Sequence, residues 1–310
     1  MQIRRILMAT DCSPAALAAE GVVEVLAKTL GAEVTLLYVD EIASFGFHSA
    51  EELSTYVEKF AAVIDEQLER SEQRFIDADI KVETIRTEGK AWREILKNAD
   101  RYEVDLIAVA KHGSRGLQRM LVGSTTTRVV RRAALPVLVV PANGASEETE
   151  TGEDAPISLR RILATTDFSE DSDEGMKRVV ELADKLDSEV LLTHVVRFPS
   201  LIPTIPGEIG LLTNPNLRAR MGLDADKELM WRIEELRSTR VRPQVLFGYG
   251  IAETLTEGEA AERTDLYVIP THGKGRIESL LLGSNTDGLL SLARKPVLVM
   301  PRTFLAASAS

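Results

Sequence analysis

The chain has 310 residues, of which 44% are apolar and 27% charged, and its formal net charge is −11. A length about twice that of an ordinary domain predicts two domains, and no apolar run approaches the roughly 18 residues that a membrane-spanning helix needs. The negative charge argues against a nucleic-acid backbone as the main partner, and the single cysteine excludes an internal disulfide, which fits a cytoplasmic location.

The first half of the chain alternates segments typical of strands with segments typical of helices. An apolar strand at 4–10 is followed by a helix with Ser13 as N-cap, Pro14 in its first turn and Gly31 as C-cap. The elements predicted after it are strands at 33–39, 81–87, 105–110 and 136–141 and helices at about 50–77, at 91–102 and from Gly123 onward. Nearly continuous apolar strands joined by helical crossovers predict a doubly wound α/β domain, a five-stranded parallel sheet with helices on both faces.

The same scheme returns in the second half of the chain. IRRILMATD (3–11) matches LRRILATTD (159–167) at six of nine positions, and DLIAVAKHG (105–113) and LPVLVVP (135–141) return as DLYVIPTHG (265–273) and KPVLVMP (295–301). This duplication predicts domain 1 at residues 1–141, an acidic linker at 142–157, domain 2 at 158–303 and a C-terminal tail at 304–310.

In an open parallel sheet, ligands bind beyond the carboxyl ends of the strands, near the point where strand order reverses. The predicted ends of the first and second strands contribute Thr10, Asp11, Val39, Thr166, Asp167 and Val195. The two aspartates suit a hydrogen bond to a ribose hydroxyl or a share in holding a divalent ion, and they suit equally well the local turn before the first helix.

The loop after the fourth strand has the features of a phosphate-binding loop. Glycines let the backbone approach a ligand, and a helix that opens with Gly-Ser offers unpaired N–H groups and a hydroxyl to a phosphate. These loop residues are Gly113, Arg115, Arg119, Gly123 and Ser124 in copy one and Gly273, Lys274, Arg276, Gly283 and Ser284 in copy two. The same pattern also describes an ordinary turn and helix cap, and we expect His112 and His272 to order these loops rather than to catalyse a reaction.

Motifs of common enzymes are missing from the sequence. The chain has no G-x-x-x-x-G-K-[ST] loop, no G-x-G-x-x-G after the first strand, no G-x-S-x-G elbow and no Cys/His metal set. We expect Cys12 to be a small residue that fills space after a strand rather than a nucleophile.

At these residues the sequence resembles the universal stress protein family in its tandem two-domain form. Nucleotide-binding members carry G-x2-G-x9-G-[ST] after the fourth strand, and nine residues separate Gly113 from Gly123 and Gly273 from Gly283. The resemblance implies that each copy holds an adenine nucleotide, ATP or AMP, with Mg²⁺ or Mn²⁺ as a candidate companion. It places the second-strand valine at the base, the first-strand aspartate near the ribose and the glycine loop around the phosphates, and it implies no catalytic residue.

The residues to which the resemblance assigns nucleotide binding are Thr10, Asp11, Val39, Ala110, Gly113, Arg115, Gly123, Ser124 and Thr125 in copy one and Thr166, Asp167, Val195, Gly273, Lys274, Gly283, Ser284 and Asn285 in copy two. It also implies a role in stress tolerance, an internal pseudo-dimer of the two copies and a homodimer that pairs through the last strands.

Both copies depart from the family pattern at its first glycine, which is Ala110 in copy one and Pro270 in copy two. Alanine adds one methyl group, whereas proline also fixes φ and removes the N–H, so we expect copy one to be the better nucleotide site. The apolar segment 198–216 of copy two is a candidate lid, partner surface or pocket for an apolar ligand, but packing over the domain interface is the favoured interpretation.

The leading hypothesis is a cytoplasmic stress-response protein that binds adenine nucleotide. A second hypothesis, motivated by Ala110 and Pro270, is an interaction module with degenerate loops that binds a protein partner or an apolar ligand. A third is an enzyme that hydrolyses ATP, because positioning and electrostatics alone promote phosphoryl transfer.

Overall fold

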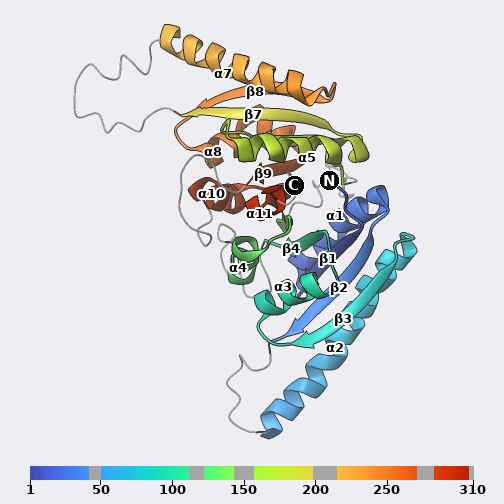
Figure 1. Ribbon diagram of the computed structural model, residues 1–310. Helices are drawn as coiled ribbons and strands as arrows, with labels where there is room; N and C mark the ends of the chain where they lie inside the picture. The colour runs from blue at the N-terminus through green and yellow to red at the C-terminus, as the bar shows by residue number, and fades with distance from the viewer. Residues whose placement is uncertain (42–49, 112–121, 143–156, 198–214, 271–282, 307–310) are drawn as a thin grey trace, which may run out of the picture. The chain divides into compact units, whose positions relative to one another are not determined.

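The computed structural model describes residues 1–41, 50–111, 122–142, 157–197, 215–270 and 283–306. Its contacts divide the chain into two compact units, one spanning Gln2–Ile157 and the other containing Ser158–Ser310 (Figure 1). Each unit is built of helices around a parallel sheet, so the predicted class of two tandem α/β domains is confirmed.

The first unit follows the predicted alternation of strands and helices. Its elements are β1 (Arg5–Thr10), α1 (Pro14–Leu30), β2 (Glu33–Asp40), α2 (Ala50–Asp77), β3 (Val82–Glu88), α3 (Ala91–Arg101), β4 (Leu106–Ala110), α4 (Ser124–Arg132) and β5 (Val137–Val140). The strands lie in the order β3-β2-β1-β4-β5, and every neighbouring pair is parallel. Strand order therefore reverses between β1 and β4.

The second unit repeats this topology. Its elements are β6 (Arg161–Thr165), α5 (Glu170–Leu186), β7 (Glu189–Arg197), α7 (Pro215–Leu236), β8 (Val241–Gly248), α8 (Ile251–Thr256), α9 (Gly258–Glu262), β9 (Leu266–Pro270), α10 (Ser284–Leu292), β10 (Val297–Met300) and α11 (Arg302–Ala306). The order β10-β9-β6-β7-β8 is again parallel throughout, and it reverses between β6 and β9. Where the sequence predicted a tail from residue 304, Leu305 of α11 is buried.

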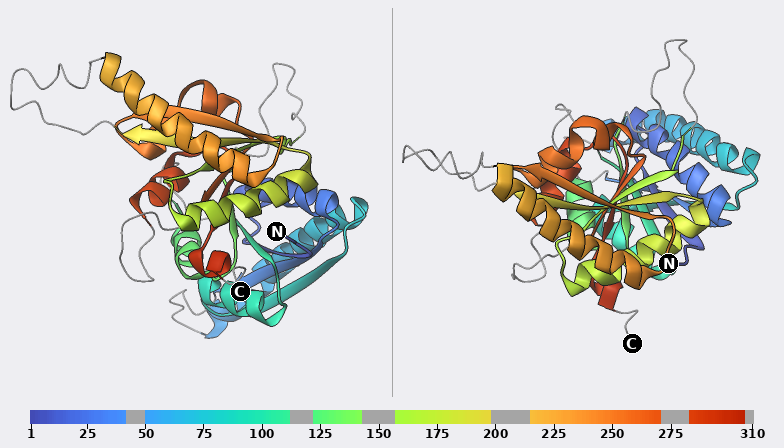
Figure 2. Two further views of the ribbon diagram at one scale, coloured as in Figure 1. Left: turned by 45° about the horizontal axis from the view of Figure 1, so that its top comes forward. Right: turned by 90° about the horizontal axis from the view of Figure 1, so that it is seen from above.

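Helices cover both faces of each sheet. In β1 the consecutive side chains of Ile6, Leu7 and Met8 are all fully buried, which requires cover on both faces because successive strand residues point to opposite sides. Within the first unit α1 packs beside α2, and α3 packs beside α4 (Figure 2). Ile162 and Leu163 of β6 repeat the two-sided burial in the second unit.

Local signals in the sequence set the ends of the first helix of each unit. Ser13 Oγ accepts a hydrogen bond from the Ala16 N–H at 3.3 Å, and Gly31 ends α1 in the left-handed region with φ 64°. Ser169 caps α5 in the same way, and Asp187 ends it at φ 54°. The caps predicted for α1 are confirmed, and they fix where the chain leaves β1. In the described ranges no helix is both long and apolar enough to cross a membrane.

Candidate functional site

The carboxyl ends of β1, β2 and β4 meet at one edge of the first sheet. Thr10 pairs with Tyr38 of β2, and the preceding Ala9 pairs with Val109 of β4. Val39 follows Tyr38 and Ala110 follows Val109, so both residues lie beside Thr10. This edge is the switch point between β1 and β4, where parallel sheets bind ligands.

The turn after β1 uses both candidate polar side chains. Cys12 adopts a left-handed φ of 57°, and its N–H donates to Thr10 Oγ1 at 3.1 Å. The Ser13 N–H donates to Asp11 Oδ1 at 3.1 Å. Asp11 therefore takes part in the local turn, one of the two roles that the sequence left open, and its role toward a ligand stays a prediction.

Copy two builds the same turn with more hydrogen bonds. Phe168 has φ 63°, and its N–H donates to Thr166 Oγ1 at 3.0 Å. Asp167 Oδ1 accepts the Ser169 N–H at 3.1 Å and the hydroxyls of Ser169 and Ser172 at 2.5 and 2.6 Å. Asp167 therefore anchors the first turn of α5.

The β4–α4 connection begins and ends at the same point. The Gly123 N–H donates to the Lys111 carbonyl at 2.8 Å, and the Lys111 N–H donates to Val140 of β5 at 2.7 Å. In the first turn of α4, Thr126 Oγ1 donates to the Ala110 carbonyl at 2.7 Å. These bonds hold the N-terminus of α4 at the carboxyl end of β4. Gly113 and Arg115 lie outside the described residues.

The first turn of α4 presents polar groups to solvent. No side chain caps the helix, no acidic residue lies in its first turn, and Ser124 is exposed with Thr125 partly exposed beside it. A helix N-terminus with this composition carries partial positive charge and attracts anions.

The corresponding helix of copy two, α10, differs in charge. It opens after Gly283 with the exposed residues Ser284 and Asn285, and Asp287 lies in its first turn. Gly283 has an ordinary φ of −59°, and a Cβ there would meet no atom within 4 Å, so neither backbone strain nor packing requires glycine. Val195 is buried in β7, and Pro270 pairs with Met300 of β10. Gly273 and Lys274 lie outside the described residues.

Burial changes the chemistry of two side chains near the first edge. It lowers the pKa of Lys111, which is 5% exposed, from 10.5 to about 8. Burial, followed by the charge of Asp11, raises the pKa of the Cys12 thiol to about 11. Cys12 therefore stays a thiol at neutral pH, which supports a structural role over a nucleophilic one.

The predictions from sequence missed the charge difference between α4 and α10. The nine residues of α4 include Arg128, Arg131 and Arg132 and no acid, whereas those of α10 include Asp287 and no basic residue. The signal for this difference lies in the sequence, where the two helices align at an offset of 160 residues. Across the described ranges, no group of three or more His, Cys, Asp or Glu side chains is arranged to hold a metal ion.

The repeated site agrees with the chain's match to known proteins. The model of the universal stress protein family matches residues 2–141 and again residues 158–301. The chain belongs to the universal stress protein family. The two matches support its tandem form.

Relatives and solved structures point the same way. Universal stress protein MJ0531 of Methanocaldococcus jannaschii is 31% identical over 138 residues, which cover 44% of this chain and 81% of the relative. Universal stress protein MJ0577 of the same organism is 30% identical over 157 residues, 47% of this chain and 97% of the relative. A universal stress protein structure from Archaeoglobus fulgidus aligns over 96% of both chains with a TM-score of 0.63 at 19% identity, a likeness of fold.

Proposed function

We propose that this universal stress protein binds an adenine nucleotide at the β1/β4 edge of its first unit, in the service of a stress response. The observation that carries the proposal is the position of α4. Its uncapped N-terminus is fixed by the Gly123–Lys111 hydrogen bond beside the end of β1, at the switch point of a parallel sheet. Helix N-termini at such points are suited to phosphate because their amide groups and partial charge face the ligand.

The remaining groups at this edge suit the other parts of a nucleotide. Ser124 and Thr125 supply hydroxyls for phosphate oxygens, and Val39, partly exposed at the end of β2, offers backbone to a base. A divalent ion would arrive with the phosphates, and Asp11 is the carboxylate at the end of β1.

Charge makes the first copy the stronger phosphate site. Arg128 lies one turn into α4, whereas the equivalent position of α10 is Gly288. Thr127 of α4 is replaced by Asp287, whose negative charge in the first turn of α10 opposes an anion bound there. The replacement of the first motif glycine by Pro270 in copy two acts in the same direction.

The direct test is the nucleotide content of the purified protein, followed by titration of the stripped protein with ATP and AMP. Gly123→Val should raise the Kd for nucleotide at least tenfold, because a branched side chain would stand at the opening of α4. Gly123 has φ −57° and ψ 146°, which valine can adopt, so the variant should fold. Gly283→Val is the matched control in copy two and should change this Kd far less.

A second pair of variants tests the charge argument. Thr127→Asp should weaken binding to copy one, and Asp287→Thr should strengthen binding to copy two. The proposal fails if the denatured protein releases no adenine nucleotide and the stripped protein binds neither ATP nor AMP.

A further inference from the structure

The segment that covers β7 and β8 in the second unit differs from its counterpart in the first. In copy one, α3 is a single helix in which Ile95, Asn98 and Ala99 are buried. In copy two, the chain breaks between α8 and α9 at Gly258, which replaces Asn98 and adopts a left-handed φ of 71°. Glycine permits this conformation at little cost, so the break is built into the sequence.

A second pair of replacements brings α8 close to α10. Ala252 stands where copy one has Trp92, and Gly288 of α10 stands where copy one has Arg128. A Cβ at Gly288 would lie 2.8 Å from the Ala252 Cβ, so the two helices pack at a distance that only glycine allows. The copies therefore use different side chains and different packing between these equivalent helices.

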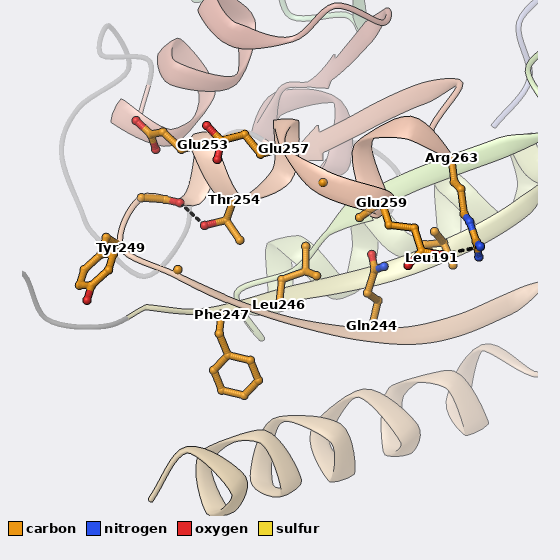
Figure 3. Close-up of a pocket in the computed structure, with 14 residues that line it drawn as sticks. Leu191, Gln244, Leu246, Phe247, Tyr249, Glu253, Thr254, Glu257, Glu259 and Arg263 are labelled. Atoms are coloured by element: carbon orange, nitrogen blue, oxygen red, sulfur yellow. Dashed lines mark hydrogen bonds and ion pairs between the residues drawn. The ribbon is translucent and has the colours of Figure 1, made fainter. Parts of the chain in front are cut away.

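A cavity of about 940 Å³ lies between α8–α9 and the sheet (Figure 3). Leu191 of β7 and Gln244 and Leu246 of β8 form its floor, while Phe247 points to the opposite face of the strand, toward a helix on that side. Gly248 and Gly250 leave room for side chains of α8, since a Cβ on either would overlap Thr254 or Glu253. Ligand pockets are commonly about 300–1,000 Å³ in volume, so the cavity has the size of a small-molecule site.

The lining of this cavity carries an excess of negative charge. Its charged residues are Glu253, Glu257, Glu259 and Arg263. Arg263 forms an ion pair with Glu259, one turn away. Glu253 and Glu257 are exposed, and among the residues that the structure describes neither forms an ion pair with a cation.

Three further features favour a cation with an apolar body. Glu253 lies in α8 and Glu257 is the extended residue that follows it, and a cation bound in the cavity would reduce the repulsion between these two carboxylates. Tyr249, 66% exposed, stands at the Glu253 end of the cavity, and aromatic faces attract ammonium groups. The floor of Leu191 and Leu246 offers apolar surface to methylene groups.

We propose that the cavity between α8–α9 and the β7–β8 face binds an aliphatic polyamine, with ammonium groups at Glu253 and Glu257 and methylene groups along Leu191 and Leu246. This ligand site is separate from the candidate nucleotide site and does not depend on it. Its ligand is opposite in charge to a nucleotide.

The experiment is titration calorimetry with spermidine on the full chain, stripped of nucleotide, at a fixed ionic strength near 0.15 M so that weak surface attraction is screened. The expected result is saturable binding of one spermidine per chain. In the double variant Glu253→Gln, Glu257→Gln the Kd should rise at least tenfold. Ala260→Phe, which fills the cavity and leaves the charge unchanged, should abolish binding.

Asp224→Asn, Asp226→Asn is the matched control, because it removes the same charge from exposed positions of α7 outside the cavity. It should leave the Kd within twofold of that of the unaltered protein. Circular dichroism of each variant checks that it is folded. Equal weakening by the control variant, full binding by Ala260→Phe, or no saturable binding by the unaltered protein would each overturn the proposal.

Discussion

Replacing Lys111 by methionine should stabilise the first unit at neutral pH. Lys111 follows the last residue of β4 and is buried, and its burial lowers its pKa from 10.5 to about 8. Methionine has a similar length and no charge, so it fits the same space without the cost of removing an ammonium group from water.

The pKa change gives both the size and the pH dependence of this effect. One pKa unit corresponds to about 1.4 kcal/mol, so the charged form of Lys111 opposes folding by about 3 kcal/mol. Below pH 8 the lysine is protonated in both states and this cost is fully present. Between pH 8 and 10.5 the unfolded chain binds the proton and the folded chain does not, so stability rises with pH across this window.

The assay is urea unfolding followed by tryptophan fluorescence. The chain has two tryptophans, Trp92 in the first unit and Trp231 in the second, so the background variant Trp231→Phe leaves a signal from the first unit alone. The quantity to compare is the gain in free energy of unfolding that Lys111→Met gives over the background protein. This gain should be about 3 kcal/mol larger at pH 7 than at pH 10.5.

Lys81→Met is the control, because Lys81 is 77% exposed and pairs with Glu33 at the surface. It should change stability little at either pH, since surface ion pairs contribute about 1 kcal/mol or less. If the stability gain from Lys111→Met is the same at pH 7 and at pH 10.5, Lys111 is not a destabilising buried cation.

Two further substitutions test the contacts of α1. Gly31→Ala should cost about 1 kcal/mol in urea unfolding, because its φ of 64° strains an L-residue while no atom within 4 Å would clash; Gly31→Asn should cost less. Ser71→Ala should cost about 2 kcal/mol at pH 7, because Ser71 Oγ donates at 2.7 Å to Glu20, which is 1% exposed. Burial raises the pKa of Glu20, so this cost should shrink as pH falls and the folded carboxyl is protonated; a cost that grows on acidification would contradict the assignment.

Much of the fold could be predicted because its signals are local. Ser13, Pro14 and Gly31 mark the ends of α1 by their own backbone preferences, and the bounds predicted for the long helix at 50–77 agree with α2. The parallel sheets followed from apolar strands that alternate with helices. The second copy then confirmed the pattern at equivalent positions, since one set of packing rules serves both.

The site could be predicted only as a set of residues. The sequence named Thr10, Val39 and Ala110, but only the register of β1 with β2 and β4 shows that they end side by side. The hydrogen bond of Asp11 in the local turn is known only from the distance to the Ser13 N–H, and its role toward a ligand stays a prediction. Burial of Lys111 could not be foreseen, because a lysine in a loop motif is usually solvated.

The break between α8 and α9 was missed for a different reason. The second copy was expected to repeat the helix of the first, and one residue, Gly258, changed that outcome by taking a left-handed φ. The close approach of Ala252 and Gly288 was missed as well, because these residues lie on different helices and meet only when the helices pack together. Nonlocal packing of this kind does not appear in the periodicity of either segment.

At the turn after the first strand the two copies agree, and at the helix that follows the fourth strand they differ in charge. Both copies keep a threonine and an aspartate after the first strand, a left-handed residue next, and a serine that caps the first helix. These residues form the hydrogen bonds of the turn in each unit. The positions that differ include Thr127 and Asp287, in the first turns of equivalent helices. A change of charge there alters the attraction for an anion and leaves the turn intact, which is the pattern expected if the duplicated units now serve different ligands.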